Sequence, residues 1–215
     1  MSEQKKKVGN TFFDGAAILA AGVIIVKLIG VLYKIPLGNI LTNESYADFS
    51  TAYNIYTLLL TVSTAGLPVA LSTTVSEANA LGRRNQVHKI FKVGVFTFFT
   101  LGLISAVIMS VFADPLTRAM SNPNALLCVR VLAPSALFVC CMSSLRGYAQ
   151  GHSNMKPTAV SQIIEALCKL LIGLGLAVLV LRWGYGQGAA AGAAIFGVTV
   201  GTFLSLVYLI FDHVI

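Results

Sequence analysis

The stretch that decides the fold is the apolar run Gly15-Ala-Ala-Ile-Leu-Ala-Ala-Gly-Val-Ile-Ile-Val-Lys-Leu-Ile-Gly-Val-Leu-Tyr-Lys-Ile-Pro-Leu37. It is long enough to cross a bilayer, because a membrane helix needs about 20 apolar residues. A polar segment, residues 1–14, precedes it and carries three lysines. A basic start before an apolar run is also typical of a signal peptide, but this run is longer than a signal-peptide core, and further apolar runs follow. We therefore expect a retained first membrane helix.

The composition extends this interpretation to the whole chain. Of its 215 residues, 56% are apolar and 11% are charged, whereas soluble domains are about 25% charged. A short chain has a large surface relative to its volume, and 23 charged side chains are too few to cover it. Disorder requires low hydrophobicity and high charge, so it is excluded as well. The net charge of +7 does not indicate a nucleic-acid partner, because the cations lie at the ends of apolar runs.

We expect an all-α, polytopic membrane helix bundle of about six transmembrane helices. β-Strands of a membrane barrel would instead alternate apolar and polar residues in runs of about ten. The second span is longer than a bilayer requires, so we expect a tilt or a kink. Pro68 in Gly66-Leu67-Pro68 favours a break there, because proline lacks the N–H that would bond to the carbonyl of Thr64. The bundle covers residues 15–211, with spans at residues 15–37, 45–75, 90–112, 125–142, 157–181 and 188–211.

The loops predict the orientation of the bundle. Loops 1–14, 76–89 and 143–156 together carry eight Lys and Arg, whereas loops 38–44, 113–124 and 182–187 carry two. Cytoplasmic loops are enriched in Lys and Arg. We therefore expect a multi-pass protein of the cell membrane, with a cytoplasmic tail at residues 1–14 and both termini in the cytoplasm.

Ionisable residues inside the spans are the candidate functional residues, because charges in a bilayer are costly. Lys27 lies near the middle of the first span, and Lys34 lies seven residues later, so both share one helix face. They predict a cationic stripe that faces an aqueous cavity. For Lys34, snorkelling to the outer interface is the alternative. Arg130 lies near the outer end of the fourth span, and this position favours the interpretation that its side chain also snorkels to the outer interface.

The fifth span carries a polar face with Gln162, Glu165 and Lys169. Glu165 and Lys169 are four residues apart, in the order that favours a helical ion pair. Either they neutralise each other, or they line the same cavity as Lys27. Both interpretations remain open at this stage.

The sixth span carries Gly188, Gly192, Gly197 and Gly201 in two small-xxx-small patterns, which predict close helix packing.

Motifs for metal binding, redox chemistry and catalysis are missing. The three histidines lack metal-ligand spacing, the four cysteines form no CxxC pair, and no nucleophile motif is present. The segment Gly184-Tyr-Gly-Gln-Gly188 has no acidic residue about 20 positions later, as a dinucleotide site requires. We expect no catalytic residue, metal or cofactor, and hence no enzyme.

Two segments resemble a known family: Ala65-Gly-Leu-Pro-Val-Ala-Leu-Ser72, and Arg146-Gly-Tyr-Ala-Gln-Gly151 with the following Met155-Lys-Pro-Thr-Ala-Val-Ser-Gln162. They are similar to the polysaccharide transport, or oligosaccharide flippase, family of the multidrug/oligosaccharidyl-lipid/polysaccharide exporter superfamily. The resemblance covers about residues 12–211 and is strongest to the branch of stage V sporulation protein B-like and lipid II flippase-like proteins. Thr73 departs from it, because relatives often carry a cation there.

The resemblance implies a transporter of two helical lobes that moves an undecaprenyl-linked sugar between the leaflets by alternating access. Lys27 matches a cavity cation that meets the lipid pyrophosphate in such proteins. Six spans correspond to one lobe, so the resemblance also implies a missing C-terminal lobe as partner. A cation-coupled drug exporter of the same superfamily is the alternative, and it would require an unpaired acid in the membrane. A non-transporting membrane assembly protein is a further alternative.

The orientation can be tested with single cysteines at Asn85, Asn122 and Ser153, introduced into a variant that lacks the four native cysteines. In intact cells, an impermeant thiol reagent is expected to label the cysteine at position 122 only, because the other two lie in the cation-rich loops. Labelling at positions 85 and 153 but not at 122 would refute this topology.

Overall fold

The computed structural model describes the backbone of residues 2–214 and the side chains of residue 15 and of residues 17–213. Within these ranges the chain is helical, without a β-strand, which confirms the all-α expectation. Six segments are long and apolar enough to cross a membrane. The chain is therefore a multi-pass membrane protein. The segments are Ala17–Ile40, Asn43–Ala80, Arg84–Val111, Pro123–Gly151, Lys156–Arg182 and Gln187–His213.

The first half of the chain forms the helices α1 (Ser2–Ile40), α2 (Asn43–Thr64), α3 (Leu67–Ala80), α4 (Arg84–Val111) and α5 (Ala113–Ala119). Helix α1 continues past the expected end at residue 37, so the turn before α2 is short. The side chains of the expected tail, residues 2–14, and the whole of Met1 lie outside the described residues.

The second half contains a 3₁₀ turn (Pro123–Ala125), α6 (Leu126–Gly151), α7 (Lys156–Cys168), a π-turn (Lys169–Gly173), α8 (Leu174–Arg182) and α9 (Gln187–Val214). One expectation needs correction here. Residues 143–151, expected in a loop, continue α6, so Arg146 lies in the helix and not in a cytoplasmic loop. The expected loop 76–89 is shorter as well, because residues 76–80 belong to α3 and residues 84–89 belong to α4.

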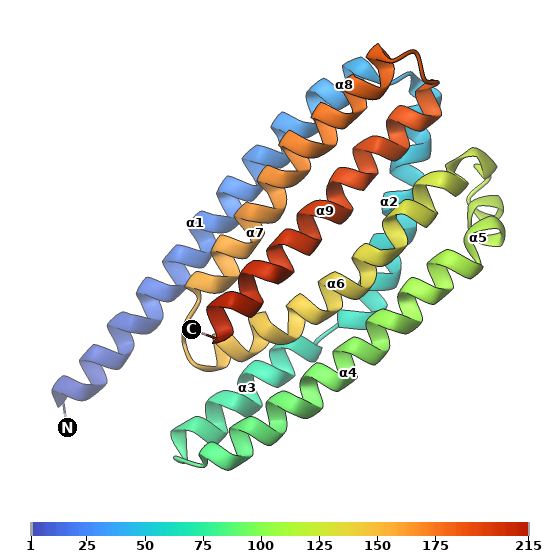
Figure 1. The fold of residues 1–215 in the computed structure, drawn as a ribbon. Coiled ribbons are helices and arrows are strands. Elements are labelled where there is room, and N and C mark those ends of the chain that lie inside the picture. The colour runs from blue at the N-terminus through green and yellow to red at the C-terminus, as the bar shows by residue number, and fades with distance from the viewer. Residues whose placement is uncertain (1, 215) are drawn as a thin grey trace.

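The second span is broken between α2 and α3. Ala65 follows the last residue of α2 as its C-cap, and Gly66 has a φ of 74°, a left-handed conformation that glycine adopts without a Cβ clash. Leu67 and Pro68 then begin α3, where the missing N–H of proline costs nothing. The break lets α3 turn away from α2 and pack on α4 and α6 (Figure 1).

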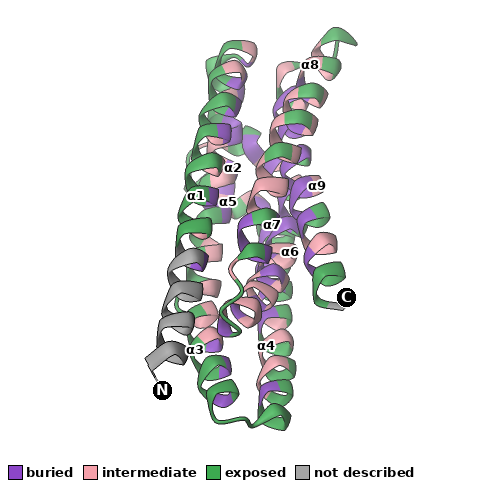
Figure 2. Ribbon diagram, turned by 90° about the vertical axis from the view of Figure 1, so that its left-hand side faces the viewer, coloured by how far each residue is buried: buried purple, intermediate pink, exposed green. Residues whose placement is uncertain are grey.

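Helices α6 and α9 form the centre of the bundle. Half of the residues in their most apolar segments are buried, against 11–22% in the other four spans, and Figure 2 shows this concentration of buried residues. Their contact is partly polar: Ser135 donates a hydrogen bond to Thr199 (2.9 Å), which donates to the carbonyl of Val131 (2.8 Å). Such bonds satisfy hydroxyls that have no water to bond in a membrane interior.

Three glycines of α9 lie at helix contacts. At Gly197 an added Cβ would overlap the backbone of Gly173 in the π-turn. At Gly201 it would lie 2.9 Å from the carbonyl oxygen of Glu165, and at Gly192 it would lie 3.2 Å from Leu127. Gly188 has open space around it. Close packing of α9 on the fifth span therefore depends on Gly197 and Gly201, and Gly192 contacts α6.

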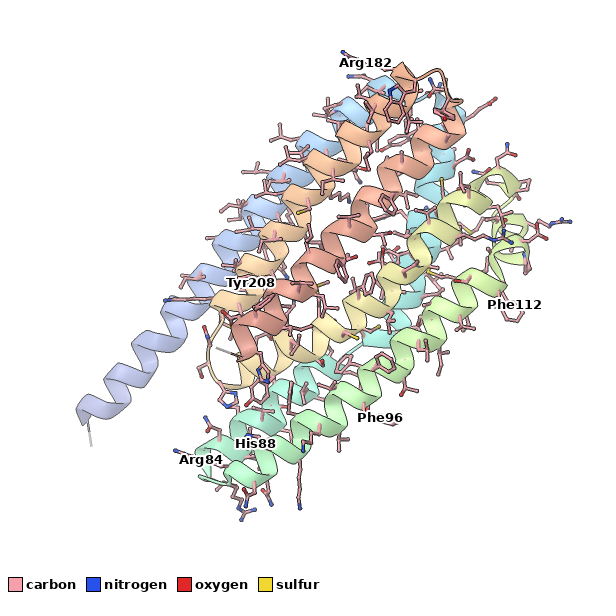
Figure 3. All side chains as sticks on the ribbon, viewed as in Figure 1. Arg84, His88, Phe96, Phe112, Arg182 and Tyr208 are labelled. Carbon is pink, nitrogen blue, oxygen red and sulfur yellow. The ribbon has the colours of Figure 1, made fainter. Side chains whose placement is uncertain are left out.

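The outer surface of the bundle suits a bilayer. Phe96 of α4 and Phe112, which directly follows α4, are mostly exposed and project outward (Figure 3). The charged residues labelled in the same view lie at opposite ends: Arg182 at one end, and Arg84 with His88 at the other. An apolar flank between polar ends is the pattern that a membrane-spanning unit requires.

The contact between Gly197 and Gly173 can be tested by adding one methyl group. Gly197→Ala is expected to destabilise the protein by about 1–3 kcal/mol, because overpacking forces the two backbones apart. The matched control is Gly188→Ala, which has space for the methyl group and is expected to be neutral or stabilising. Thermal unfolding in detergent, followed by the fluorescence of Trp183, measures both. Equal melting temperatures for the two variants would contradict the packing argument.

Candidate functional site

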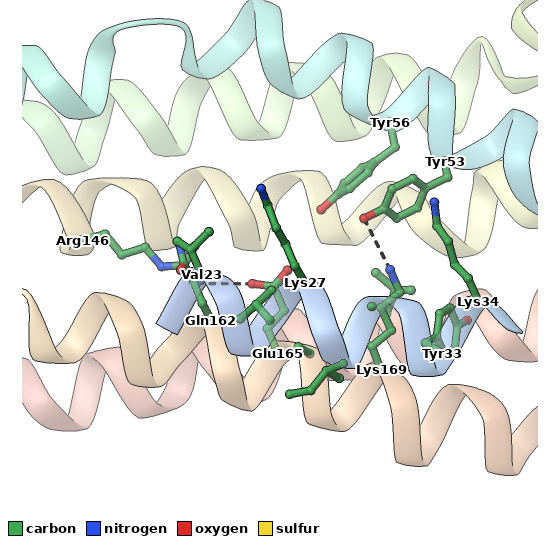
Figure 4. A pocket seen from close by; sticks show the side chains of 15 residues that line it. Val23, Lys27, Tyr33, Lys34, Tyr53, Tyr56, Arg146, Gln162, Glu165 and Lys169 are labelled. Atoms are coloured by element: carbon green, nitrogen blue, oxygen red, sulfur yellow. Dashed lines mark hydrogen bonds and ion pairs between the residues drawn. The ribbon is translucent and has the colours of Figure 1, made fainter. Parts of the chain in front are cut away.

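A cavity of about 500 Å³ lies between α1, α2 and the fifth span, with α6 and α9 also contributing to its wall. The structure brings all five predicted polar residues together around it, as Figure 4 shows. The four residues predicted for hinge and packing, Pro68, Gly192, Gly197 and Gly201, do not line it. The residues brought together are Lys27, Lys34, Gln162, Glu165 and Lys169.

Lys27 and Lys34 supply the cations on the α1 side of the cavity. Both side chains are exposed, and Gly30 between them also lines the cavity, so this stripe of α1 faces the open space. Helix α1 packs against α7 beside the cavity, where Gly22 meets Ala159. Arg130 of α6 is exposed but does not line the cavity.

Glu165 pairs with Arg146 and not with Lys169, so of the two interpretations left open by the sequence, the structure has both residues lining the cavity and not forming a helical ion pair. A guanidinium nitrogen, Nη2, of Arg146 lies 3.3 Å from Oε2 of Glu165, and the two side chains are 14% and 29% exposed. The Nε of Arg146 donates to Ser161 at 3.0 Å, and Nη2 also lies 3.5 Å from Ser205. Arginine forms this network because its fork of donors reaches several acceptors at once.

Lys169 is held by aromatic rings. Its Nζ lies 5.0 Å from the ring centre of Tyr33 and 4.6 Å from that of Tyr53, within cation–π range. It also lies 3.5 Å from the hydroxyl of Tyr53. Tyr53 belongs to a row of rings on α2 and stacks on Phe49 with 6.0 Å between ring centres. The rings hold the ammonium group without neutralising its charge.

Gln162 adds a neutral acceptor to the cavity lining. Its Oε1 atom is buried and has no hydrogen-bond partner among the described residues. A buried polar atom without a partner costs free energy, so this amide is suited to accept a hydrogen bond from a ligand or a water molecule. The hydroxyl-bearing ring of Tyr56 lines the same cavity.

The cavity has a positive charge. Four cationic side chains and one carboxylate line it, and the Arg146–Glu165 pair is internally neutral. Among the side chains that the structure describes, none of the three lysines has a carboxylate within 4.0 Å. No cluster of three His, Cys, Asp or Glu occurs in the described part of the chain either. The arrangement therefore suits an anionic ligand, which the lysines would attract and Gln162 would orient.

Sequence reasoning missed Arg146, Tyr33 and Tyr53. The fourth apolar run ends at residue 142 in the sequence, so the pattern predicts a loop at Arg146, although the chain remains helical to residue 151. The tyrosines carried a detectable signal, since Tyr33 precedes Lys34 and Tyr53 lies on the same helix face as Phe49 and Tyr56.

The fold defines the chain as a polytopic membrane helix bundle. A solved multidrug resistance MATE family transporter of the MOP superfamily, in the outward-facing conformation, has this fold with a TM-score of 0.74 at 16% identity. The match covers 92% of the present chain and 44% of that transporter. The model of the family described as polysaccharide biosynthesis protein matches residues 12–214, and the chain belongs to this family.

Two relatives from Bacillus subtilis (strain 168) extend the comparison. The lipid II flippase MurJ is 32% identical over 205 residues, which is 91% of the present chain. Stage V sporulation protein B is 29% identical over 200 residues, or 93% of the chain. The chain spans 38% of the length of each of these two relatives.

The aromatic contact of Lys169 can be tested at Tyr53. Tyr53→Leu is expected to destabilise the protein by about 0.5–2 kcal/mol, because it removes a ring that faces the ammonium group. Tyr53→Phe keeps the ring and loses only a long hydrogen bond, so its melting temperature is expected to stay near that of the unchanged protein. Equal losses in both variants would show that the hydroxyl, and not the ring, holds Lys169.

Proposed function

We propose that the chain is one lobe of a flippase that moves a lipid-linked oligosaccharide or peptidoglycan precursor across the cytoplasmic membrane by alternating access. The observation that carries this proposal is the group of three lysines, without a carboxylate partner in the described side chains, around one cavity within the spans. Family membership and the similarity to a lipid II flippase support the choice of substrate class.

The chemistry of such a substrate fits the cavity. A polyprenyl diphosphate carries its negative charge between an apolar chain and a polar sugar. Lys27 lies near the middle of the first span, where an isolated cation would cost at least about 2.5–3.5 kcal/mol. A diphosphate in the cavity would offset this cost. Gln162 would accept a hydrogen bond from a sugar hydroxyl, and the lipid chain would remain in the bilayer.

A second lobe is the partner that this mechanism requires. Alternating access needs two bodies that move around a shared site, and one wall of the present cavity is open at Lys27 and Lys34. The chain also spans only 38% of the length of each of the two Bacillus subtilis relatives. We infer that a C-terminal lobe covers the exposed lysine stripe and completes the pathway.

The similarity of the fold to a multidrug resistance transporter favours one alternative, a cation-coupled drug exporter. Coupling to a cation would use a carboxylate that is free to bind it. The carboxylate that lines the cavity, Glu165, is paired with Arg146. The positive cavity therefore supports an anionic substrate more than a cationic drug.

For the orientation, we infer that the N-terminus, the C-terminus and the loop between α3 and α4 face the cytoplasm. Without the cavity residue Arg146, the segments 1–14, 76–89 and 152–156 at the inferred inner side carry seven Lys and Arg, whereas the segments 38–44, 113–124 and 182–187 at the outer side carry two.

Lys27 provides the test of the function. In a transporter that includes both lobes, Lys27→Ala is expected to abolish complementation of a flippase-depleted strain at normal protein abundance. Lys27→Arg is expected to retain more activity, because the charge is kept. The matched control is Arg130→Ala, which removes a cation outside the cavity and is expected to complement. Full complementation by Lys27→Ala would overturn the proposal.

A further inference from the structure

Among the described side chains, Arg146 is the one cavity cation that contacts a carboxylate, that of Glu165. The side chain of Arg146 is less exposed than that of Glu165. The Arg146 side chain is 14% exposed, and it reaches acceptors on two other helices: Ser161 and Glu165 of α7, and Ser205 of α9. Ser205 is itself fixed, because its hydroxyl donates to the carbonyl of Ser161 at 2.7 Å. The guanidinium group therefore has a defined position at the inner wall of the cavity.

This position decides which cation Glu165 neutralises. Glu165 shares the cavity with Lys27 and lies four residues before Lys169, where a helical ion pair is favoured. Without Arg146, a carboxylate in such a poorly solvated site would pair with one of these lysines, because an unpaired charge there is costly. One lysine would then be lost to an internal pair.

We propose that Arg146 is a positioning residue for substrate binding: it holds the carboxylate of Glu165 away from Lys27 and Lys169, so that these ammonium groups stay available to a diphosphate. This inference rests on the proposed function for the identity of the ligand. Arg146 needs no contact with the substrate in this role, because it acts through the charge that it neutralises.

The network also explains why arginine suits the position. A lysine ammonium can approach Glu165, but it lacks the planar fork that serves Ser161, Glu165 and Ser205 together. Removal of Arg146 alone leaves Glu165 charged and free to move. Removal of both charges leaves the three lysines without a competing carboxylate. The single and double variants therefore separate a positioning role from a purely structural one.

The first experiment detects the competing pair directly and needs no substrate. A membrane-permeable carbodiimide joins a carboxylate to an amine where the two are in contact, and it does not couple a guanidinium group. In membranes that contain Arg146→Gln, peptide mass spectrometry is expected to find an amide between Glu165 and Lys27 or Lys169. In the unchanged protein this amide is expected to be several-fold less abundant. Equal yields in the two proteins would overturn the proposal.

The second experiment measures binding of farnesyl diphosphate to the purified protein in detergent by calorimetry, with farnesol as the uncharged control probe. Arg146→Gln is expected to weaken binding about tenfold, and the double variant Arg146→Gln/Glu165→Gln is expected to recover to within about threefold of the unchanged protein. Arg146→Lys keeps a positive charge beside Glu165, so its affinity is expected to lie between the affinities of Arg146→Gln and of the double variant. A double variant as weak as Arg146→Gln would show a structural role and overturn the proposal.

The two experiments also separate this inference from the proposed function. If the unchanged protein does not bind farnesyl diphosphate, or if Lys27→Ala binds it equally well, the proposed function fails. The carbodiimide experiment still decides, in that case, whether Arg146 keeps Glu165 away from the lysines.

Discussion

The backbones of α9 and the fifth span meet at Gly197 and Gly173, and the cavity depends on this contact. Because neither residue has a Cβ, the two helices approach closely enough for Ser205 of α9 to bond the carbonyl of Ser161 and to reach Arg146. The same approach fixes α7, and with it Gln162 and Glu165, relative to the core helices α6 and α9. Packing of small residues thus determines where the charged residues lie.

The cavity combines two kinds of cation. Arg146 is bound to serines and a carboxylate, whereas Lys169 is held by the rings of Tyr33 and Tyr53. A hydrogen-bonded ion pair compensates the charge, but an aromatic contact leaves most of it available to a ligand. Since membrane interiors tolerate few charges, this division lets the protein keep a positive cavity while the Arg146–Glu165 pair remains stable.

The sequence predicted the membrane spans and the cavity-facing residues for a simple reason: charges within apolar runs are rare and need a polar environment. The seven-residue spacing predicted that Lys27 and Lys34 share one helix face. The cluster from Gln162 to Lys169 predicted the polar wall of the cavity that faces them. The partner of Glu165 was not predictable in this way, because spacing favours Lys169, whereas tertiary packing brings Arg146 from another helix. The end of α6 was missed because polar residues after Met142 resemble a loop, although they form buried contacts within the bundle.

The π-turn at Lys169–Gly173 lets the fifth span carry one extra residue without rotating its two ends relative to each other. A π-turn holds one residue more than the α-helical turn that it replaces, and its wider turn absorbs that residue. Deletion of one residue there would restore a regular helix of nearly the same hydropathy, and α7 would keep its orientation relative to Gly173. Gln162 and Glu165 would therefore stay at the cavity. Lys169 lies inside the π-turn, so the same deletion would move its ammonium group relative to the rings of Tyr33 and Tyr53.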